Sequence, residues 1–115
     1  MNIWRIIAGL IGATGILAAA FGSHGLEKIT DTRGVRLWAI AAAIELVTAP
    51  VLLWVSSNVR ASSWSGPLLA GGLALFCGTL YAMALGAPKW LGAVTPMGGL
   101  LLTAGWLTIA FLKGN

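Results

Sequence analysis

Four apolar runs, each close to twenty residues long, constrain the fold of this 115-residue chain more than any other feature. They occupy residues 3–21, 37–55, 67–85 and 90–112. A helix needs about 20 apolar residues to cross the roughly 30 Å hydrocarbon core of a bilayer. Spans in lipid are helices or strands of a closed barrel, and continuous runs without period-two alternation are not those of a barrel. The sequence therefore predicts one transmembrane domain, residues 1–115, with four helices.

The composition also indicates lipid surroundings. Apolar residues make up 58% of the chain and charged residues only 9%, whereas a soluble domain has roughly 25% charged residues. The seven basic residues stand singly or in small groups at the edges of the apolar runs, which is typical of headgroup anchors rather than of a nucleic-acid-binding face. Membrane lipid is the expected partner, and nucleic acid is not.

Short connections between the runs predict an up-down-up-down arrangement. The expected fold class is an all-α membrane protein, an antiparallel four-helix transmembrane bundle with both termini on one side. Three basic residues flank the runs on that side and four on the other: Arg5, Arg60 and Lys113 against Lys28, Arg33, Arg36 and Lys89. This difference is too small for the positive-inside rule to decide the orientation. A secretory signal ending near residue 20 is an alternative for the first run, but its length and its glycines favour an uncleaved helix.

The connections are expected at residues 22–36, 56–66 and 86–89. In the first, Thr30 or Asp31 is a candidate N-cap for a helical turn that leads into the second span. Thr95 followed by Pro96 is typical of an N-cap and a first helical residue, so the residues just before Thr95 are expected to form a short entering turn.

Glycine and alanine recur at spacings of three and four residues in every run, and small side chains let transmembrane helices approach closely. We expect this pattern to serve packing within the bundle first and contacts between copies second. The candidate packing glycines are Gly9, Gly12, Gly15 and Gly78. Five tryptophans lie near predicted span ends, as is typical of the headgroup level, whereas Trp106 lies inside the fourth run and is expected to pack in the bundle.

Glu45 is the one ionisable side chain well inside an apolar run. It lies roughly 12 Å into the second span, where a charged acid costs on the order of 2.5–3.5 kcal/mol. Such an acid is a hypothesis for a proton- or cation-handling site, and equally for a protonated carboxyl group bonded to a neighbouring helix. Pro50 frees the Leu46 carbonyl in the adjacent turn, and Thr48 lies between them. The candidate site is therefore Glu45, Thr48 and Pro50.

His24 and Glu27 follow the first span and form a candidate polar interface at the membrane surface. A lone histidine in this place is more typical of a hydrogen-bonding anchor than of a ligand, so no metal and no other cofactor is expected. Cys77 is interpreted as a small buried apolar residue. No nucleophile elbow, phosphate loop or catalytic pair is present in the sequence, and an enzyme is not expected.

Three blocks of sequence occur in order along the chain: AFGSHGL at 20–26, FCGTLY at 76–81, and VTPMGG at 94–99 followed by AGW at 104–106. In order and spacing they resemble the signature blocks of the YgdD-like family of small membrane proteins. The resemblance implies a four-span protein of the cell inner membrane, from a family of unknown function. The motif residues are Phe21, Gly22, His24, Gly25, Leu26, Tyr81, Thr95, Pro96, Gly98, Gly99, Gly105 and Trp106.

The second span departs from that family, which usually has Tyr and His there. Pro50 stands near the place of the histidine, so a relay shared with His24 is not expected unless Glu45 substitutes. Three functions stay open. The first is a structural or accessory protein that is a homo-oligomer or a subunit of a larger membrane complex. The second is a small proton- or cation-coupled transporter or channel using Glu45, and the third is a lipid- or quinone-binding protein.

Overall fold

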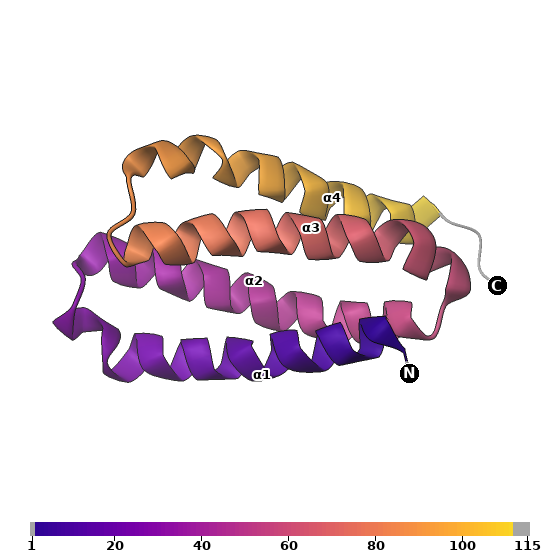
Figure 1. Cartoon of the computed structure of the whole chain (residues 1–115), viewed down its shortest axis with the longest axis horizontal. Coiled ribbons are helices and arrows are strands. Elements are labelled where there is room, and N and C mark those ends of the chain that lie inside the picture. Colours follow the sequence, from indigo (N-terminus) through magenta and orange to yellow (C-terminus); the bar gives the residue numbers. More distant parts are fainter. Residues whose placement is uncertain (1, 112–115) are drawn as a thin grey trace.

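The computed structural model describes residues 2–111, with the backbone alone for residues 59–62. Its elements are α1 (Ile3–His24), η1 (Leu26–Lys28), α2 (Thr32–Ser56), α3 (Val59–Ala84), η2 (Lys89–Ala93) and α4 (Thr95–Phe111), where η marks a 3₁₀-helix. The four long helices run antiparallel, and α1 begins at the same end of the molecule at which α4 ends (Figure 1). Among the described residues, four segments are long and apolar enough to cross a membrane, and the fourth, Lys89–Phe111, combines η2 with α4. The predicted all-α, antiparallel four-helix membrane fold is confirmed.

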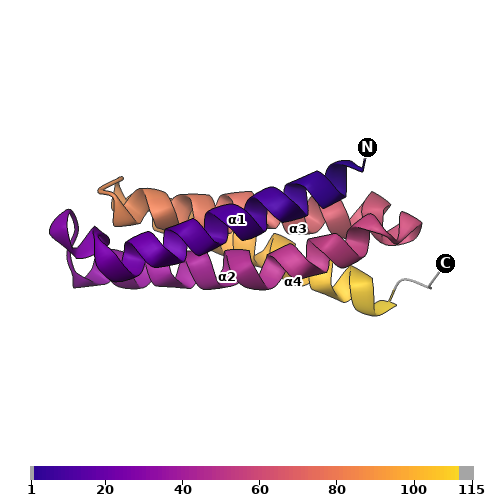
Figure 2. The ribbon, with the colours of Figure 1, turned by 90° about the horizontal axis from the view of Figure 1, so that it is seen from below.

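The helices pack in the order of the sequence, α1 on α2, α2 on α3 and α3 on α4. Figure 1 shows α1 and α4 at opposite edges of this row. Figure 2 shows the row from below, and its extents are 48 × 27 × 20 Å. Only 11% of the α1 span is buried, against 39% of the α3 span. The two central helices therefore hold the core, and α1 is a peripheral helix.

Side-chain caps set the starts of α1 and α2. The Asn2 side chain accepts a hydrogen bond from the Trp4 amide, and the Asp31 side chain accepts one from the Gly34 amide at 2.8 Å. Of the two candidate caps, Thr30 and Asp31, it is Asp31 that caps α2, which begins at Thr32. The first connection is consequently shorter than the predicted 22–36. The Thr30 hydroxyl donates to the Ala84 carbonyl at 2.6 Å and ties this connection to α3.

The second connection differs from the prediction. Residues 56–66 were expected to be a loop, yet α2 ends at Ser56 and α3 already begins at Val59 and continues through Pro67. Tertiary contacts explain the difference, because they override weak helix propensity. Ser65 is fully buried and pairs with the Thr108 hydroxyl at 2.7 Å, and a side chain on Gly66 would overlap Trp4 of α1.

The third connection contains the predicted entering turn, which is η2. Gly86 has a φ of 106°, a conformation that only glycine adopts readily, and it turns the chain out of α3. Thr95 is the first residue of α4 rather than its side-chain cap. Its hydroxyl turns back to the Leu91 carbonyl at 3.2 Å and lies 2.6 Å from the Thr79 hydroxyl, so it joins α4 to α3.

Glycines give the closest approach of helices, which is between α3 and α4. A Cβ on Gly72 would lie 2.6 Å from the Leu102 amide nitrogen, and one on Gly98 would overlap the Phe76 amide nitrogen. Further along α4, a Cβ on Gly105 would lie within 3 Å of the Leu69 side chain. Backbone therefore packs directly on backbone along this pair, as in other small-residue contacts between transmembrane helices.

The four glycines predicted to pack fall into two groups. Gly12 and Gly15 lie against α2, where added Cβ atoms would be 3.6 Å from Ala49 and 2.9 Å from Leu46. Gly9 and Gly78 do not pack, since a Cβ there would meet no atom within 4 Å. Spacing alone does not distinguish these groups, because small residues occur on more than one face of α1 and α3.

Trp106 also differs from its predicted place. Its side chain is 45% exposed on the outer surface of α4 rather than packed inside the bundle. There it lines a groove with Trp54 of α2. An indole at this position meets lipid, and its size is accommodated because it does not have to fit between closely packed helices.

Candidate functional site

Glu45 lies near the middle of α2, between α1 and α3, and only 7% of its surface is exposed. Its surroundings on α2 are small residues, because Ala41, Ala42 and Ala49 are all buried. On α1, Gly15 brings its backbone close to the Glu45 side chain, and a Cβ there would lie 3.4 Å from the Glu45 Cγ. Small neighbours on two helices thus make room for one long polar side chain inside the bundle.

Hydroxyl groups from both neighbouring helices meet the two carboxyl oxygens of Glu45. The Thr14 Oγ1 on α1 lies 2.5 Å from Oε2, and the Tyr81 hydroxyl on α3 donates to Oε1 at 2.8 Å. We call Thr14, Glu45 and Tyr81 the Glu45 cluster. It is a polar tie among three helices in a region where lipid offers a free carboxyl group no partner.

The Thr14 hydroxyl has two possible acceptors for its hydrogen, one of which is Glu45. Its oxygen also lies 2.8 Å from the Leu10 carbonyl, yet a hydroxyl has one hydrogen to donate and two lone pairs to accept with. When Thr14 donates to Glu45, the two hydroxyls satisfy a carboxylate. When Thr14 donates to Leu10, its oxygen accepts the proton of a carboxylic acid. The heavy atoms therefore suit both forms of Glu45 without moving.

A stack of aromatic rings adjoins Tyr81 of the Glu45 cluster on the side of the first connection. Trp38 of α2 meets Tyr81 edge to face with ring centroids 4.5 Å apart, and Phe21 of α1 meets Trp38 in the same manner at 5.5 Å. The Trp38 indole nitrogen donates to the Ala18 carbonyl at 2.7 Å. The stack fixes the Tyr81 ring and hence the position of its hydroxyl.

The structure does not bring Thr48 and Pro50 to Glu45. Thr48 is buried, but its hydroxyl donates to the Ile44 carbonyl of its own helix at 2.7 Å. Pro50 is exposed and stands five residues from Glu45, which is about 140° around a helix. The predicted three-residue site is corrected here to Thr14, Glu45 and Tyr81, with Trp38 beside them.

Sequence reasoning did not single out Thr14 or Trp38 and included Tyr81 only as a motif residue. One signal was present, because Thr14 is a hydroxyl residue within the glycine-rich part of the first run. Trp38 was interpreted as a headgroup anchor, since the second helix was expected to begin close to it. The cap at Asp31 moves the start of α2 earlier and leaves Trp38 within the bundle.

His24 and Glu27 lie away from the Glu45 cluster. Both are exposed, at the end of α1 and in η1. Glu27 lines a surface pocket of about 440 Å³ together with residues of the first connection and of the start of α2. Within the part of the chain that the structure describes, no group of three His, Cys, Asp or Glu side chains is arranged to hold a metal ion.

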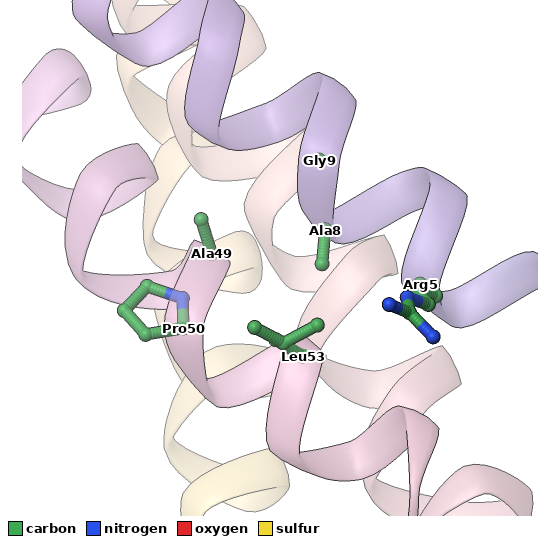
Figure 3. Close-up of a pocket in the computed structure, with 6 residues that line it drawn as sticks. All are labelled: Arg5, Ala8, Gly9, Ala49, Pro50 and Leu53. Atoms are coloured by element: carbon green, nitrogen blue, oxygen red, sulfur yellow. The ribbon is translucent and has the colours of Figure 1, made fainter.

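Two apolar grooves lie on the outer surface, and both include Pro50. One, of about 320 Å³, runs between α1 and α2 and has Arg5 in its wall (Figure 3). The other, of about 290 Å³, lies between α2 and α4 and has Trp54 and Trp106 in its wall. Glu45 lines neither groove, nor does it line the pocket beside Glu27.

Most motif residues lie at helix contacts. Leu26 is fully buried, and a Cβ on Gly22 would lie 2.8 Å from Trp38. A Cβ on Gly25 would lie 3.2 Å from Phe21, and one on Gly99 would lie 3.6 Å from Phe76. The motif thus marks the aromatic stack, the α3 and α4 contact and Tyr81 of the Glu45 cluster, while Pro96 is exposed at the start of α4.

Comparison with known proteins gives a consistent family. The model of a family described as "Protein of unknown function (DUF423)" matches residues 18–99. A UPF0382 membrane protein of Schizosaccharomyces pombe is 36% identical over 95% of this chain and 98% of its own length. A UPF0382 membrane protein of Staphylococcus epidermidis is 35% identical over 98% of both chains, and YwdK of Bacillus subtilis, another UPF0382 membrane protein, is 27% identical. No solved structure gives a significant match. With its four spans and this similarity over nearly its whole length, the chain belongs to the DUF423 or UPF0382 family of membrane proteins, whose activity is unknown.

Proposed function

We propose that this membrane protein is a structural or accessory component, and that Glu45 stabilises its bundle rather than carrying an ion or catalysing a reaction. One observation supports this most directly. The Glu45 carboxyl group forms hydrogen bonds with the Thr14 and Tyr81 hydroxyls, and these bonds join α1 and α3 to α2. A transport site needs access to water from each side in turn, whereas only 7% of the Glu45 surface is exposed.

The proposal includes assembly with a second copy or with a larger membrane complex. Gly78, expected to pack within the bundle, lies on the outer surface of α3 with open space beside it. The peripheral α1 also leaves most of its span unburied. These features support contacts with other transmembrane helices, because lipid provides no hydrophobic drive and small residues permit close packing.

Residence in the inner, cytoplasmic membrane is also part of the proposal. Helical spans support it, since proteins of the bacterial outer membrane are strand barrels. The likeness of the three sequence blocks to YgdD-like proteins supports the same placement. Fractionation of inner and outer membranes from a Gram-negative host tests it, and recovery outside the inner-membrane fraction would contradict it.

Flux measurement separates the structural function from transport. The wild-type protein and Glu45→Gln are reconstituted into vesicles, and proton and monovalent-cation flux is measured under an imposed gradient. The structural function predicts that both stay at the leak rate of empty vesicles. Flux through the wild-type protein that Glu45→Gln abolishes, at equal reconstitution, would establish the coupled transporter instead. This outcome deserves the test because the cluster suits both proton states of Glu45.

Cross-linking in native membranes tests assembly. The wild-type chain is expected to give products larger than one chain, or to copurify with a defined partner in mild detergent. Gly78→Leu is expected to reduce these products if α3 forms the contact, and Lys89→Gln, in η2 rather than on α3, is the control. A bare monomer in both measurements would refute the accessory function.

A further inference from the structure

The groove between α1 and α2 combines one cation with an apolar wall. Figure 3 shows Arg5, Ala8 and Gly9 on α1 facing Ala49, Pro50 and Leu53 on α2. Its volume of about 320 Å³ is at the lower end of the roughly 300–1,000 Å³ typical of small-molecule sites. Arg5 is the one residue of this wall with a charged side chain, so the groove suits a ligand that is anionic at one end and apolar elsewhere.

Small residues create the space of the groove. Gly9 has no side chain, and an added Cβ would meet no atom within 4 Å. Ala8 and Ala49 contribute only a methyl group each, and Pro50 presents its ring without an N–H group. No polar side chain other than Arg5 belongs to the wall, so the space beyond the cation matches hydrocarbon.

The depth of the groove is set by a contact at the ends of the two helices. The Asn2 side-chain nitrogen donates to the Ser56 carbonyl at 2.5 Å, which places the start of α1 level with the end of α2. Arg5 and Leu53 are each three residues deeper, about 4.5 Å, and Gly9 and Ala49 are seven residues deeper, about 10 Å. The long Arg5 side chain reaches headgroup level from there, while the small residues line the upper hydrocarbon.

We propose that this groove binds one anionic phospholipid from the leaflet on the side of the termini. The Arg5 guanidinium pairs with the phosphate group through charge-assisted hydrogen bonds, and one acyl chain lies along Gly9 and Ala49. A quinone lacks the negative charge that would use Arg5. A phosphatidylcholine fits the apolar wall, but its positive choline group offsets the attraction to the guanidinium.

Native mass spectrometry of the full chain tests this site. The protein is released from nanodiscs that contain equal amounts of phosphatidylglycerol and phosphatidylcholine, and the retained lipids are counted. The wild-type chain is expected to retain phosphatidylglycerol about fivefold over phosphatidylcholine, the preference that one basic residue near an anionic surface provides. Arg5→Gln is expected to lose this preference, and Arg5→Lys to keep most of it.

A second variant tests the apolar part of the groove. Gly9→Leu fills the open space without meeting a neighbouring atom at its Cβ, and it is expected to reduce retention of both lipids. Ala20→Leu, on an exposed position near the other end of α1, and Lys89→Gln, at the other membrane surface, are controls expected to match the wild type. Equal retention of the two lipids by the wild type would overturn the site. So would an unchanged preference in Arg5→Gln, a test that does not depend on how well Gly9→Leu folds.

Discussion

At the residue scale, the partners of Glu45 predict unequal losses of stability for two substitutions of similar size. In Glu45→Gln the amide oxygen still accepts from Tyr81, and the amide nitrogen donates to Thr14 while Thr14 donates to Leu10. We expect a loss below about 1 kcal/mol in the free energy of unfolding. Glu45→Leu leaves the Tyr81 hydroxyl without its partner and is expected to cost about 1–3 kcal/mol. Denaturant unfolding in mild detergent measures both, and equal stability of the two variants would refute the tie.

A double-mutant cycle tests the contact with Tyr81 directly. Tyr81→Phe removes the hydroxyl that donates to Glu45, so its cost should shrink when Glu45 is already Leu. We expect a coupling free energy of about 0.5–3 kcal/mol between these two positions. Thr48→Val is the matched control, since the Thr48 hydroxyl bonds only within α2, and it should show no coupling with Glu45→Leu.

The sequence was sufficient to find Glu45 but not its partners. An acid inside an apolar run is exceptional whatever the fold, so hydropathy alone identifies Glu45. Thr14 and Tyr81 lie 31 and 36 residues away along the chain, and which helix faces meet is decided by packing. The Leu46 carbonyl that Pro50 frees pointed instead to Pro50 on the same helix, which lies on a different face from Glu45.

At the scale of the helices, Gly98 and Gly99 give a matched pair of substitutions on α4. Gly98→Ala places a methyl group against the backbone of α3 and is expected to destabilise the protein by about 1–3 kcal/mol through overpacking. Gly99→Ala makes only an ordinary contact with Phe76 and gains about 1 kcal/mol of helix propensity. In thermal unfolding in detergent, the melting temperature should therefore fall for Gly98→Ala. For Gly99→Ala it should rise or change little. A lower melting temperature for Gly99→Ala than for Gly98→Ala would contradict the close contact of α3 and α4.

The helix ends show where local sequence determines structure. Asp31 was one of two predicted candidate caps and is the cap of α2, because capping depends on neighbouring backbone amides. The serine-rich segment before Pro67 was predicted as a loop and is largely helical, because Ser65 and Gly66 are held by residues of α4 and α1. The secondary structure of such segments depends on contacts with helices distant in the sequence. These contacts cannot be predicted from a single sequence.

At the scale of the whole molecule, the antiparallel arrangement predicts which positions face the same side of the membrane. Single cysteines replacing Ile3, Phe111 and Glu27, all exposed, are labelled with a membrane-impermeant maleimide in right-side-out and inside-out vesicles. The variants at Ile3 and Phe111 should react in the same preparation, and the variant at Glu27 in the other. The native Cys77 is buried and should stay unlabelled. Labelling of the Ile3 and Phe111 variants in opposite preparations would refute the arrangement, whereas insertion in both orientations would label all three in each.

The packing of each helix on the next one in the chain has a consequence for biosynthesis. As the ribosome delivers α2, its partner α1 is already in the membrane, and each later helix likewise meets its neighbour on arrival. Because each helix packs mainly on the one before it, only short loops have to close. The entropic cost of loop closure during assembly is therefore small. The hairpin of α3 with α4, which has the closest backbone contacts, then closes the row of four helices.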